Sequence, residues 1–258
     1  MTARIASAAE ILALFGEAAD AQAAAVAPIG GADRRARTDR PGQYALDLVA
    51  DDAIVPLLVN AGLAVVSEES GRHEVAGATV TVVLDPVDGS TNCSRNLPYW
   101  AISLCALDAD GPLCALVANQ ATGERFTASR GEGAWADGAP IQPAATTRIE
   151  DAVIALAGMP QRALPWKQFR ALGSAALTLC DVAAGRVDGY LDALNDMHAP
   201  WDYLGGLLVC SEAGATVLDA RDRPLITDDP AVRRTLVAAG TRELLEELRG
   251  GLLEADAP

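Results

Sequence analysis

The stretch LDPVDGSTN, residues 84–92, follows the β-branched run ATVTVV at 78–83. Asp85 and Asp88 lie three residues apart in it, with Pro86 between them. Because proline fixes the backbone and lacks an N–H donor, it can break a strand and let two carboxylates converge on one point. Two such carboxylates are oxygen ligands of the kind that Mg²⁺ prefers.

The residues around the second aspartate favour a phosphate site. The backbone carbonyl of Val87 lies between the two aspartates and is a possible further metal ligand. Gly89, Ser90 and Thr91 offer backbone N–H groups where a short helix can begin, and such a start binds anions. Asp-Pro and Asp-Gly are also common turn pairs, and Asp or Ser caps helices. By itself the stretch therefore fits an ordinary turn about as well as a site.

Two distant acidic features strengthen the second interpretation. SEES, residues 67–70, begins where the strand LAVV ends, the same kind of position as Asp85. Ligands gather at strand ends in open α/β sheets, although adjacent glutamates in a loop are usually solvated. In PWDYLGG, residues 200–206, Asp202 falls in the first turn of a helix, where its alternative role is to interact with the helix dipole.

In this order, SEES, DPVDGSTN and WDYLGG resemble the inositol monophosphatase family of Mg²⁺-dependent, lithium-sensitive phosphatases. The spacing fits from about residue 44 to 219. The resemblance implies an α/β fold, a five-layer αβαβα sandwich as in inositol monophosphatase-like and fructose-1,6-bisphosphatase-like enzymes. Its site would lie between an N-terminal α+β half, residues 1–145, and a C-terminal α/β half, residues 146–258.

The resemblance also implies roles for individual residues. The implied ligands of two or three Mg²⁺ ions, for which Mn²⁺ is a possible substitute, are Glu68, Asp85, the Val87 carbonyl, Asp88 and Asp202. The implied catalytic residues are Glu68 together with Asp47 and Ser90, which would orient the attacking water. The implied substrate contacts are Asp88, Gly89, Ser90, Thr91, Gly173, Ser174, Ala175, Asp192 and Asp202.

This chain departs from the family pattern at the alcohol side of the site. GYLDALNDMHAPWD, residues 189–202, is about three residues longer than in inositol-type enzymes. That segment normally supplies an acidic contact to the alcohol, for which Asp192 is the candidate and Asn195 and Asp196 are competitors. His198 is expected to be a surface or packing histidine rather than a substrate contact. Asp47 stands in YALD, where the family usually has Thr-Glu-Ala-Asp.

The composition limits the partners. Twenty basic against 35 acidic residues give a net charge of −15, which argues against nucleic-acid or anionic-membrane binding by a basic surface. Five scattered cysteines without a CxxC pair indicate reduced thiols, and two histidines argue against a His-rich zinc site. We expect a cytoplasmic protein, because no apolar run is long enough for a membrane helix and the N-terminus does not resemble a signal peptide. The resemblance adds a homodimer and a small phosphorylated metabolite as partners.

Hydrophobic periodicity predicts helices and an antiparallel meander first, and alternating strands and helices afterwards. In the first half the expected helices are 6–27 and 45–61, and the expected strands are 63–66, 78–84, 101–107, 113–118, 124–128 and 133–136. In the second half the expected strands are 152–157, 187–192, 215–218 and 235–239, and the expected helices are 174–185, 202–213 and 241–249. Pro56 should kink or break the second helix, and residues 252–258 should fray.

The expected function is hydrolysis of a small inositol, sugar or polyol phosphate monoester by a metal-activated water. Histidinol phosphate and nucleotide 3′-phosphates are alternative substrates that relatives handle. A relative that binds a phosphorylated metabolite without catalysis is a second hypothesis. A generic α/β domain with solvated acids would be favoured if the four acidic ligands lay more than roughly 10 Å apart, since Mg²⁺ and Ca²⁺ are ligated at about 2–2.6 Å.

Overall fold

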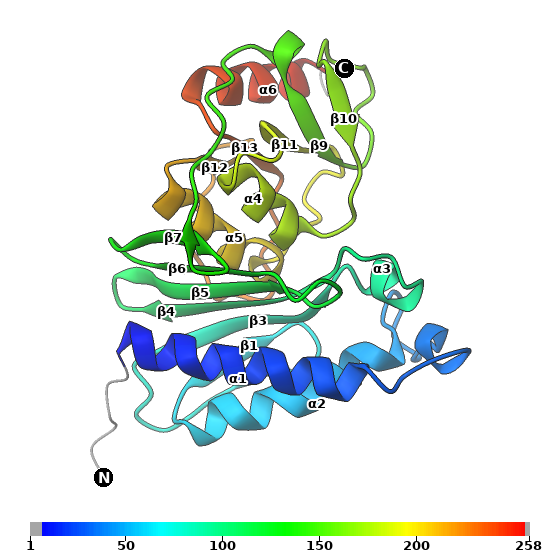
Figure 1. Ribbon diagram of the computed structural model, residues 1–258, viewed down its shortest axis with the longest axis vertical. Coiled ribbons are helices and arrows are strands. Elements are labelled where there is room, and N and C mark those ends of the chain that lie inside the picture. Colours follow the sequence, from blue (N-terminus) through cyan, green and yellow to red (C-terminus); the bar gives the residue numbers. More distant parts are fainter. Residues whose placement is uncertain (1–6, 256–258) are drawn as a thin grey trace.

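The computed structural model describes residues 7–255, and these form five stacked layers. Figure 1 shows them from bottom to top as two helices, a large sheet, two more helices, a smaller sheet and a last helix. Three apolar clusters fill the spaces between layers, so each helix or sheet buries one face against its neighbour. The predicted αβαβα architecture is therefore confirmed.

The large sheet comes entirely from the first half of the chain. Its strands lie in the order β2-β1-β3-β4-β5-β6-β7-β8, and β3 to β8 form the predicted antiparallel meander. The elements of this half are α1 (Ala8–Val26), η1 (Asp33–Arg35), α2 (Ala45–Asn60), β1 (Ala64–Ser67), β2 (Gly71–His73), β3 (Thr81–Asp88), α3 (Ser90–Ser94), β4 (Ala101–Asp108), β5 (Gly111–Asn119), β6 (Arg125–Ser129), β7 (Gly133–Ala136) and β8 (Ala139–Pro140).

The smaller sheet belongs to the second half, with strand order β10-β9-β11-β13-β12. The elements are η2 (Ile149–Asp151), β9 (Val153–Ala157), β10 (Gln168–Arg170), α4 (Ala175–Ala183), β11 (Gly189–Asp192), α5 (Pro200–Ala213), β12 (Thr216–Asp219), β13 (Leu236–Ala239) and α6 (Arg242–Ala255). Helices α4 and α5 lie between the sheets, and α5 packs directly on the large sheet. The two halves therefore share one core.

Strand β3 does not end at Leu84, as the sequence suggests, but continues to Asp88. Its pairing with β4 shifts between Asp85 and Asp88, so three steps along β3 match two steps along β4. This bulge accommodates Pro86, whose missing N–H cannot join the sheet. The proline therefore distorts the strand instead of ending it, and both aspartates remain on β3.

The sequence predicts that Pro56 kinks or breaks the second helix. Helix α2 continues through Pro56, so the predicted break is wrong. Pro56 and Asp52, one turn earlier, are both exposed to solvent. Water can satisfy the Asp52 carbonyl that loses its intrahelical partner, which is why the proline is tolerated there.

The C-terminal segment is more ordered than predicted. Helix α6 runs to Ala255, and Leu252 is buried in the cluster between α6 and the smaller sheet. Fraying of residues 252–255 is therefore wrong, because this apolar contact fixes the last turn. The final residues, 256–258, and the start of the predicted helix at residue 6 lie outside the described part of the chain.

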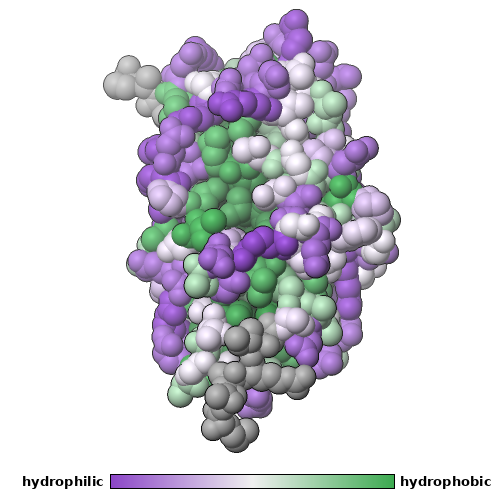
Figure 2. All heavy atoms as spheres, turned by 90° about the vertical axis from the view of Figure 1, so that its left-hand side faces the viewer, coloured by the Kyte–Doolittle hydropathy of each residue, from purple (hydrophilic) through white to green (hydrophobic). Residues whose placement is uncertain are grey.

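All five cysteines are free and buried, as expected for thiols that fill the core. Across residues 7–255, none of the helices combines the length and the apolar character needed to span a bilayer. Figure 2 shows one side of the molecule, where apolar residues gather in the middle and hydrophilic residues surround them. The homodimer stays a prediction.

Candidate metal and phosphate site

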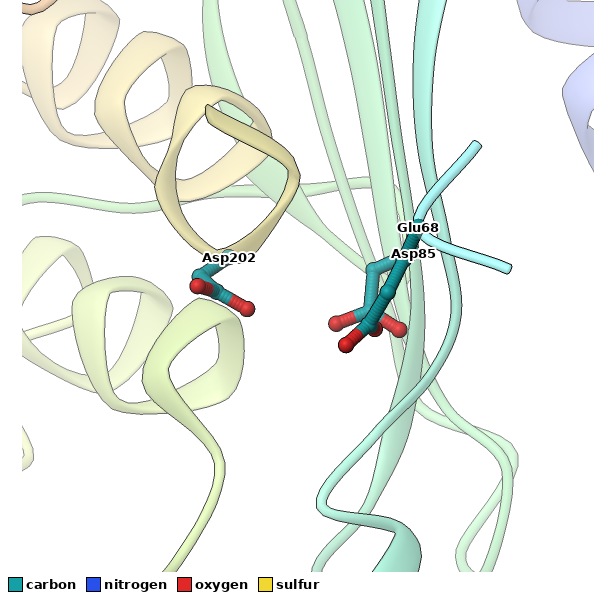
Figure 3. Close-up of side chains that lie close together, drawn as sticks. All are labelled: Glu68, Asp85 and Asp202. Atoms are coloured by element: carbon teal, nitrogen blue, oxygen red, sulfur yellow. The ribbon is translucent and has the colours of Figure 1, made fainter. Parts of the chain in front are cut away.

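Three carboxylates from three separate elements meet at the junction of the two halves. Glu68 follows β1, Asp85 lies at the bulge of β3, and Asp202 lies in the first turn of α5. One ligand oxygen from each lies within 4.8 Å of the others. Figure 3 shows Asp202 on one side of a gap and Glu68 and Asp85 on the other. A generic domain with solvated acids would be favoured by separations above roughly 10 Å, and these three carboxylates are far closer than that. The arrangement could therefore hold a metal ion.

The electrostatics of this acidic cluster (Glu68, Asp85 and Asp202) indicate a missing positive charge. Burial, with repulsion from Glu68 next, raises the pKa of Asp85 well above its usual range. Burial, followed by the charge of Asp202, raises the pKa of Glu68 to about 8. Three acids held this close cannot all ionise cheaply without a cation between them. A divalent ion would relieve that repulsion, so these residues fit a metal.

Asp88 is not part of the acidic cluster, although the sequence predicts it as a metal ligand. Its carboxylate accepts hydrogen bonds at the N-terminus of α4, from Ser174 Oγ at 2.6 Å, Ala176 N at 2.7 Å and Ala175 N at 3.3 Å. Burial, then the charge of Asp202, raises the pKa of Asp88 to about 6, although these hydrogen bonds favour the ionised form. Asp88 thus joins the β3 bulge to the start of α4.

Gly89 has a backbone conformation that would be strained for a residue with a side chain. Its φ is 90°, in the left-handed region, and a Cβ there would lie 3.0 Å from Gly173 O and 3.2 Å from Tyr99 O. The backbone of Gly173 therefore packs directly on Gly89. The predicted phosphate residues and the predicted α4 residues are brought together at this contact.

Asn92, which the sequence analysis did not single out, holds the same contact from the side. Its Nδ2 donates to Tyr99 O at 2.8 Å and to Leu172 O at 2.7 Å. A side-chain amide thereby ties the segment before α4 to the loop after α3. Its predecessor Thr91 is exposed and accepts a hydrogen bond from the Tyr44 hydroxyl at 3.2 Å.

Asp47 lies in the first turn of α2. Its Oδ2 accepts the Tyr44 N–H at 2.8 Å, and its buried Oδ1 has no hydrogen-bond partner. Burial raises the pKa of Asp47 to about 7. An unpaired buried carboxylate oxygen is costly unless something else occupies its vicinity. Pairing of Asp47 with Ser90 across a water stays a prediction.

A pocket of about 390 Å³ adjoins the acidic cluster, because Asp202 belongs to both. Its lining comes from the ends of β3 and β9, the start of α4, and the segments before α4 and α5. The residues are Asp88, Asn92, Leu156, Ala157, Gly158, Ala171, Leu172, Gly173, Ser174, Ala175, Thr178, Tyr190, Leu194, His198 and Asp202. Four of the predicted substrate-contact residues outside the β3 loop, Gly173, Ser174, Ala175 and Asp202, line it.

Asp192 differs from its predicted place, and of the two alternatives predicted for His198 the surface one is wrong. His198 lines the pocket and is not a surface histidine, since its side chain is 13% exposed. Its Nε2 is 2.8 Å from the Tyr190 hydroxyl and 3.6 Å from Asp192 Oδ2, and its Nδ1 is 3.7 Å from Asp202 Oδ2. Asp192 is completely buried behind this ring, so a direct contact between Asp192 and a substrate does not fit the structure.

Burial lowers the pKa of His198, but the neighbouring carboxylates of Asp202 and Asp192 outweigh this effect and raise the pKa above its usual value. Asp192 Oδ2 has no hydrogen-bond partner. The His198 ring lies 3.6 Å from this oxygen.

The competing candidates Asn195 and Asp196 also point elsewhere. Asn195 accepts a hydrogen bond from Arg221 at 2.9 Å. Asp196 pairs with Arg221 at 3.1 Å and with Arg223. Neither lines the pocket.

The comparisons with known proteins agree with this geometry. Residues 43–255 match the inositol monophosphatase family. The chain belongs to this family. The Nus factor SuhB of Escherichia coli is 32% identical over 207 residues, 72% of this chain and 76% of that protein. The fructose-1,6-bisphosphatase/inositol-1-monophosphatase of Thermococcus kodakarensis is 33% identical over 205 residues, 78% of each protein.

Among solved structures, a hypothetical protein from Pyrococcus horikoshii with similarities to inositol-1 monophosphatase has a TM-score of 0.85. It is 26% identical and covers 95% of this chain and 98% of its own. The suppressor protein SuhB of Bartonella henselae has a TM-score of 0.80 at 27% identity, over 94% of this chain and 98% of its own. These likenesses confirm the predicted family and the predicted fold.

Several residues that hold this inositol monophosphatase-family site in place do not belong to any sequence motif. On α1, the buried Gln22 donates from Nε2 to Pro86 O at 3.0 Å and so fixes the β3 bulge. A polar residue among alanines of an amphipathic helix is the only signal for it. Ser67, where the family usually has glycine, donates to the buried Asp51 and accepts the Glu69 N–H at 3.1 Å. This pair holds the turn that carries Glu68.

The second glutamate of SEES has a role of its own. Glu69 accepts hydrogen bonds from Gln43 and from Arg40. Arg40 also donates to the Glu68 carbonyl at 3.2 Å. The arginine-rich loop before α2 is thereby attached to the backbone of the acidic cluster.

Proposed function

We propose that this protein hydrolyses a small phosphate monoester with the help of Mg²⁺. The observation that carries the proposal is the acidic cluster, three carboxylates with ligand atoms within 4.8 Å, beside a pocket of about 390 Å³. A structural cluster of acids would be paired with basic side chains, whereas here burial and neighbouring carboxylates raise the pKa values of Glu68 and Asp85.

Glu68, Asp85 and Asp202 would hold the metal, with the Val87 carbonyl and Asp88 as further ligands from the same bulge. Asp88 would then share its carboxylate between the metal and the start of α4. When bound, the ion supplies positive charge to the phosphate oxygens and activates water for attack, which speeds a reaction that is very slow in solution. Mn²⁺ offers the same charge and is expected to substitute.

The chain itself would bind and orient the phosphate. Gly89 and Ser90 begin α3, and their backbone N–H groups are suited to phosphate oxygens. Asp47 offers a buried carboxylate oxygen without a partner and a pKa raised to about 7 by burial. A base with a pKa near the working pH is effective, so Asp47 is suited to take a proton from a water that the Ser90 hydroxyl orients.

The decisive experiment is a phosphate-release screen with Mg²⁺ or Mn²⁺ over inositol, sugar, polyol, histidinol and nucleotide 3′-phosphates. Asp85→Asn should lower kcat by at least about a hundredfold, because it removes a ligand and not merely an outer contact. Asp52→Asn changes an exposed acid on α2 and is the matched control, which should keep the wild-type rate. Release from none of these esters, or an unchanged rate in Asp85→Asn, would refute the proposal.

A second candidate is a relative that binds a phosphorylated metabolite or another partner without catalysis. It is favoured by one finding, that some of the similar proteins are named Nus factor SuhB, whereas others are named fructose-1,6-bisphosphatase. The intact acidic cluster argues against it, since a silent relative has no need of these carboxylates. Titration calorimetry that shows a phosphate ester binding without release of phosphate would support this candidate.

A further inference from the structure

We propose that the pocket beside the acidic cluster selects monophosphate esters whose alcohol is uncharged and has an apolar face, and that Leu194 sets this choice. The inference rests on the proposed function, because a phosphate at the acidic cluster would direct the alcohol into this pocket. Asp88 and Asp202 form the part of the lining nearest to the reaction. The remaining walls then meet the alcohol.

The charges of the pocket exclude a second phosphate. Every residue of its lining belongs to the described range 7–255, and among them there is no Lys or Arg. The charged side chains that face it are the acids Asp88 and Asp202 and the imidazole of His198. A second phosphate would lose water and gain no Lys or Arg partner, and the His198 ring is already shared between Asp192 and Asp202, so its entry is unfavourable.

Four apolar residues of the lining form what we call the apolar wall. It consists of Leu156 and Ala157 at the end of β9, Leu172 before α4, and Leu194 before α5. The Leu194 side chain is 48% exposed, although it lies over the end of a buried strand. An apolar substrate face would cover it and gain from its burial.

Leu194 is held in place before any ligand binds. At Gly158 a Cβ would lie only 2.5 Å from Leu194 Cδ2, so the glycine leaves the room that the leucine fills. On the far side of the segment, Asp196 pairs with Arg221 and Arg223. The backbone of His198 exchanges two hydrogen bonds with Arg234, at 3.2 and 2.8 Å.

These contacts fix residues 194–198 from outside the pocket. The apolar wall is therefore preformed, and its selectivity does not require closure of a lid. Leu194 lies in the segment 189–202, which the sequence predicts to be longer in this chain than in inositol-type enzymes.

Two matched substrate pairs test the inference. Cyclohexyl phosphate and inositol 1-phosphate share a six-membered carbon ring and differ in hydroxyl groups. Fructose 1-phosphate and fructose 1,6-bisphosphate differ in one phosphate. We expect KM to be about tenfold lower for cyclohexyl phosphate than for inositol 1-phosphate, and kcat/KM to be at least about tenfold lower for the bisphosphate than for the monophosphate.

Leu194→Asn should raise KM for cyclohexyl phosphate by about tenfold and change KM for inositol 1-phosphate by less than about twofold. Leu194→Arg should reduce the discrimination against the bisphosphate. Met197→Asn is the control, since Met197 is exposed on the same segment and does not line the pocket. It should leave both ratios unchanged.

A bisphosphate that is hydrolysed as well as its monophosphate, or a Leu194→Asn variant that shifts both ring esters equally, would overturn this inference alone. The proposed function would survive either result, because phosphate would still be released. Release from none of the four esters and none of the wider panel would overturn the proposed function and this inference together.

Discussion

At the scale of single residues, Gly89 shows how closely the phosphate loop and the start of α4 approach each other. The sequence motif predicts that Gly89 belongs to a phosphate site, but it does not predict which atoms pack against Gly89. The carbonyls that face Gly89 belong to Gly173, which is far away in the chain, and to Tyr99, which lies in another loop. No local pattern relates these residues to Gly89. The family motif thus predicts which residues act on the substrate, and the fold shows which atoms they contact.

Gly89→Ala should lower both stability and activity. The left-handed backbone costs about 1–3 kcal/mol for a residue with a Cβ, and the contact 3.0 Å from Gly173 O forces α4 away from the loop. We expect kcat/KM to fall at least about a hundredfold, because small displacements at a reacting site have such effects. Urea unfolding and phosphate release measure the two quantities.

Gly123→Ala is the control for strain alone. Gly123 has a φ of 84°, but nothing lies within 4 Å of an added Cβ and the residue does not line the pocket. It should lose stability to a similar extent and keep its activity. Equal activity loss in the two variants would contradict the role given to Gly89.

At the scale of elements, the helices and strands with a strong apolar periodicity are predicted well, whereas an exposed strand is not predicted. The meander and most helices fall within a few residues of their predicted bounds. Strand β10 was missed because all three of its residues are exposed, so no buried face marks it in the sequence. The β3 bulge was read as a strand end, since Pro86 is compatible with both and only the pairing with β4 distinguishes them.

Helix α1 is predicted to influence metal binding through Gln22. Gln22→Leu removes the hydrogen bond to the Pro86 carbonyl and leaves that buried carbonyl unpaired, at a cost of about 1–3 kcal/mol. The bulge that presents Asp85 should loosen, and the Mg²⁺ concentration for half-maximal activity should rise about 10–100-fold. Phosphate release titrated with Mg²⁺ gives this value.

Gln120→Leu is a matched control, since Gln120 follows β5 and bonds to another part of α1. Its Nε2 donates to Ala19 O at 2.8 Å, which is a bond of the same kind that does not touch the bulge. The variant should need no more Mg²⁺ than the wild type. A comparable rise in both variants would mean that α1 acts only through general stability.

At the scale of the whole molecule, the acidic cluster couples stability to pH and to metal. Glu68 has its pKa raised from 4.5 to about 8 by burial and then by Asp202, so the folded chain holds a proton that the unfolded chain releases. This contribution to stability is complete below about pH 4 and is lost as the pH rises through about 8. Asp47, with a pKa raised by burial to about 7, acts in the same direction.

In EDTA, the melting temperature of the wild type should therefore fall between pH 5 and pH 8. The melting temperature of the Glu68→Gln variant should fall less over the same range. Glu74→Gln changes an exposed acid on the neighbouring strand end and should follow the wild type. Mg²⁺ at 100 times its Kd should restore about 2.7 kcal/mol, or about 5–10 °C. At one fixed Mg²⁺ concentration the gain should be larger at pH 8 than at pH 5, because protons compete with the metal for the carboxylates. A wild-type curve parallel to that of Glu68→Gln would contradict the assignment.

The sequence motifs supplied the members of the acidic cluster but not their arrangement. Glu68 and Asp85 could be placed at strand ends, yet their meeting with Asp202 depends on α5 packing against the large sheet, which no local pattern encodes. Asp192 shows the opposite case. Its alignment with an acidic substrate residue is reasonable, but Asp192 is completely buried, and His198, 3.6 Å from its carboxylate, lines the pocket instead.

One consequence follows from the position of α5. The first half of the chain carries Glu68 and Asp85, and the third carboxylate arrives only when α5 docks on the large sheet. During synthesis, a nascent chain that has not yet produced α5 lacks Asp202, one of the three carboxylates that could hold a metal ion. We therefore predict that an ion would be captured late in maturation, and a retained ion would then report that both halves have assembled.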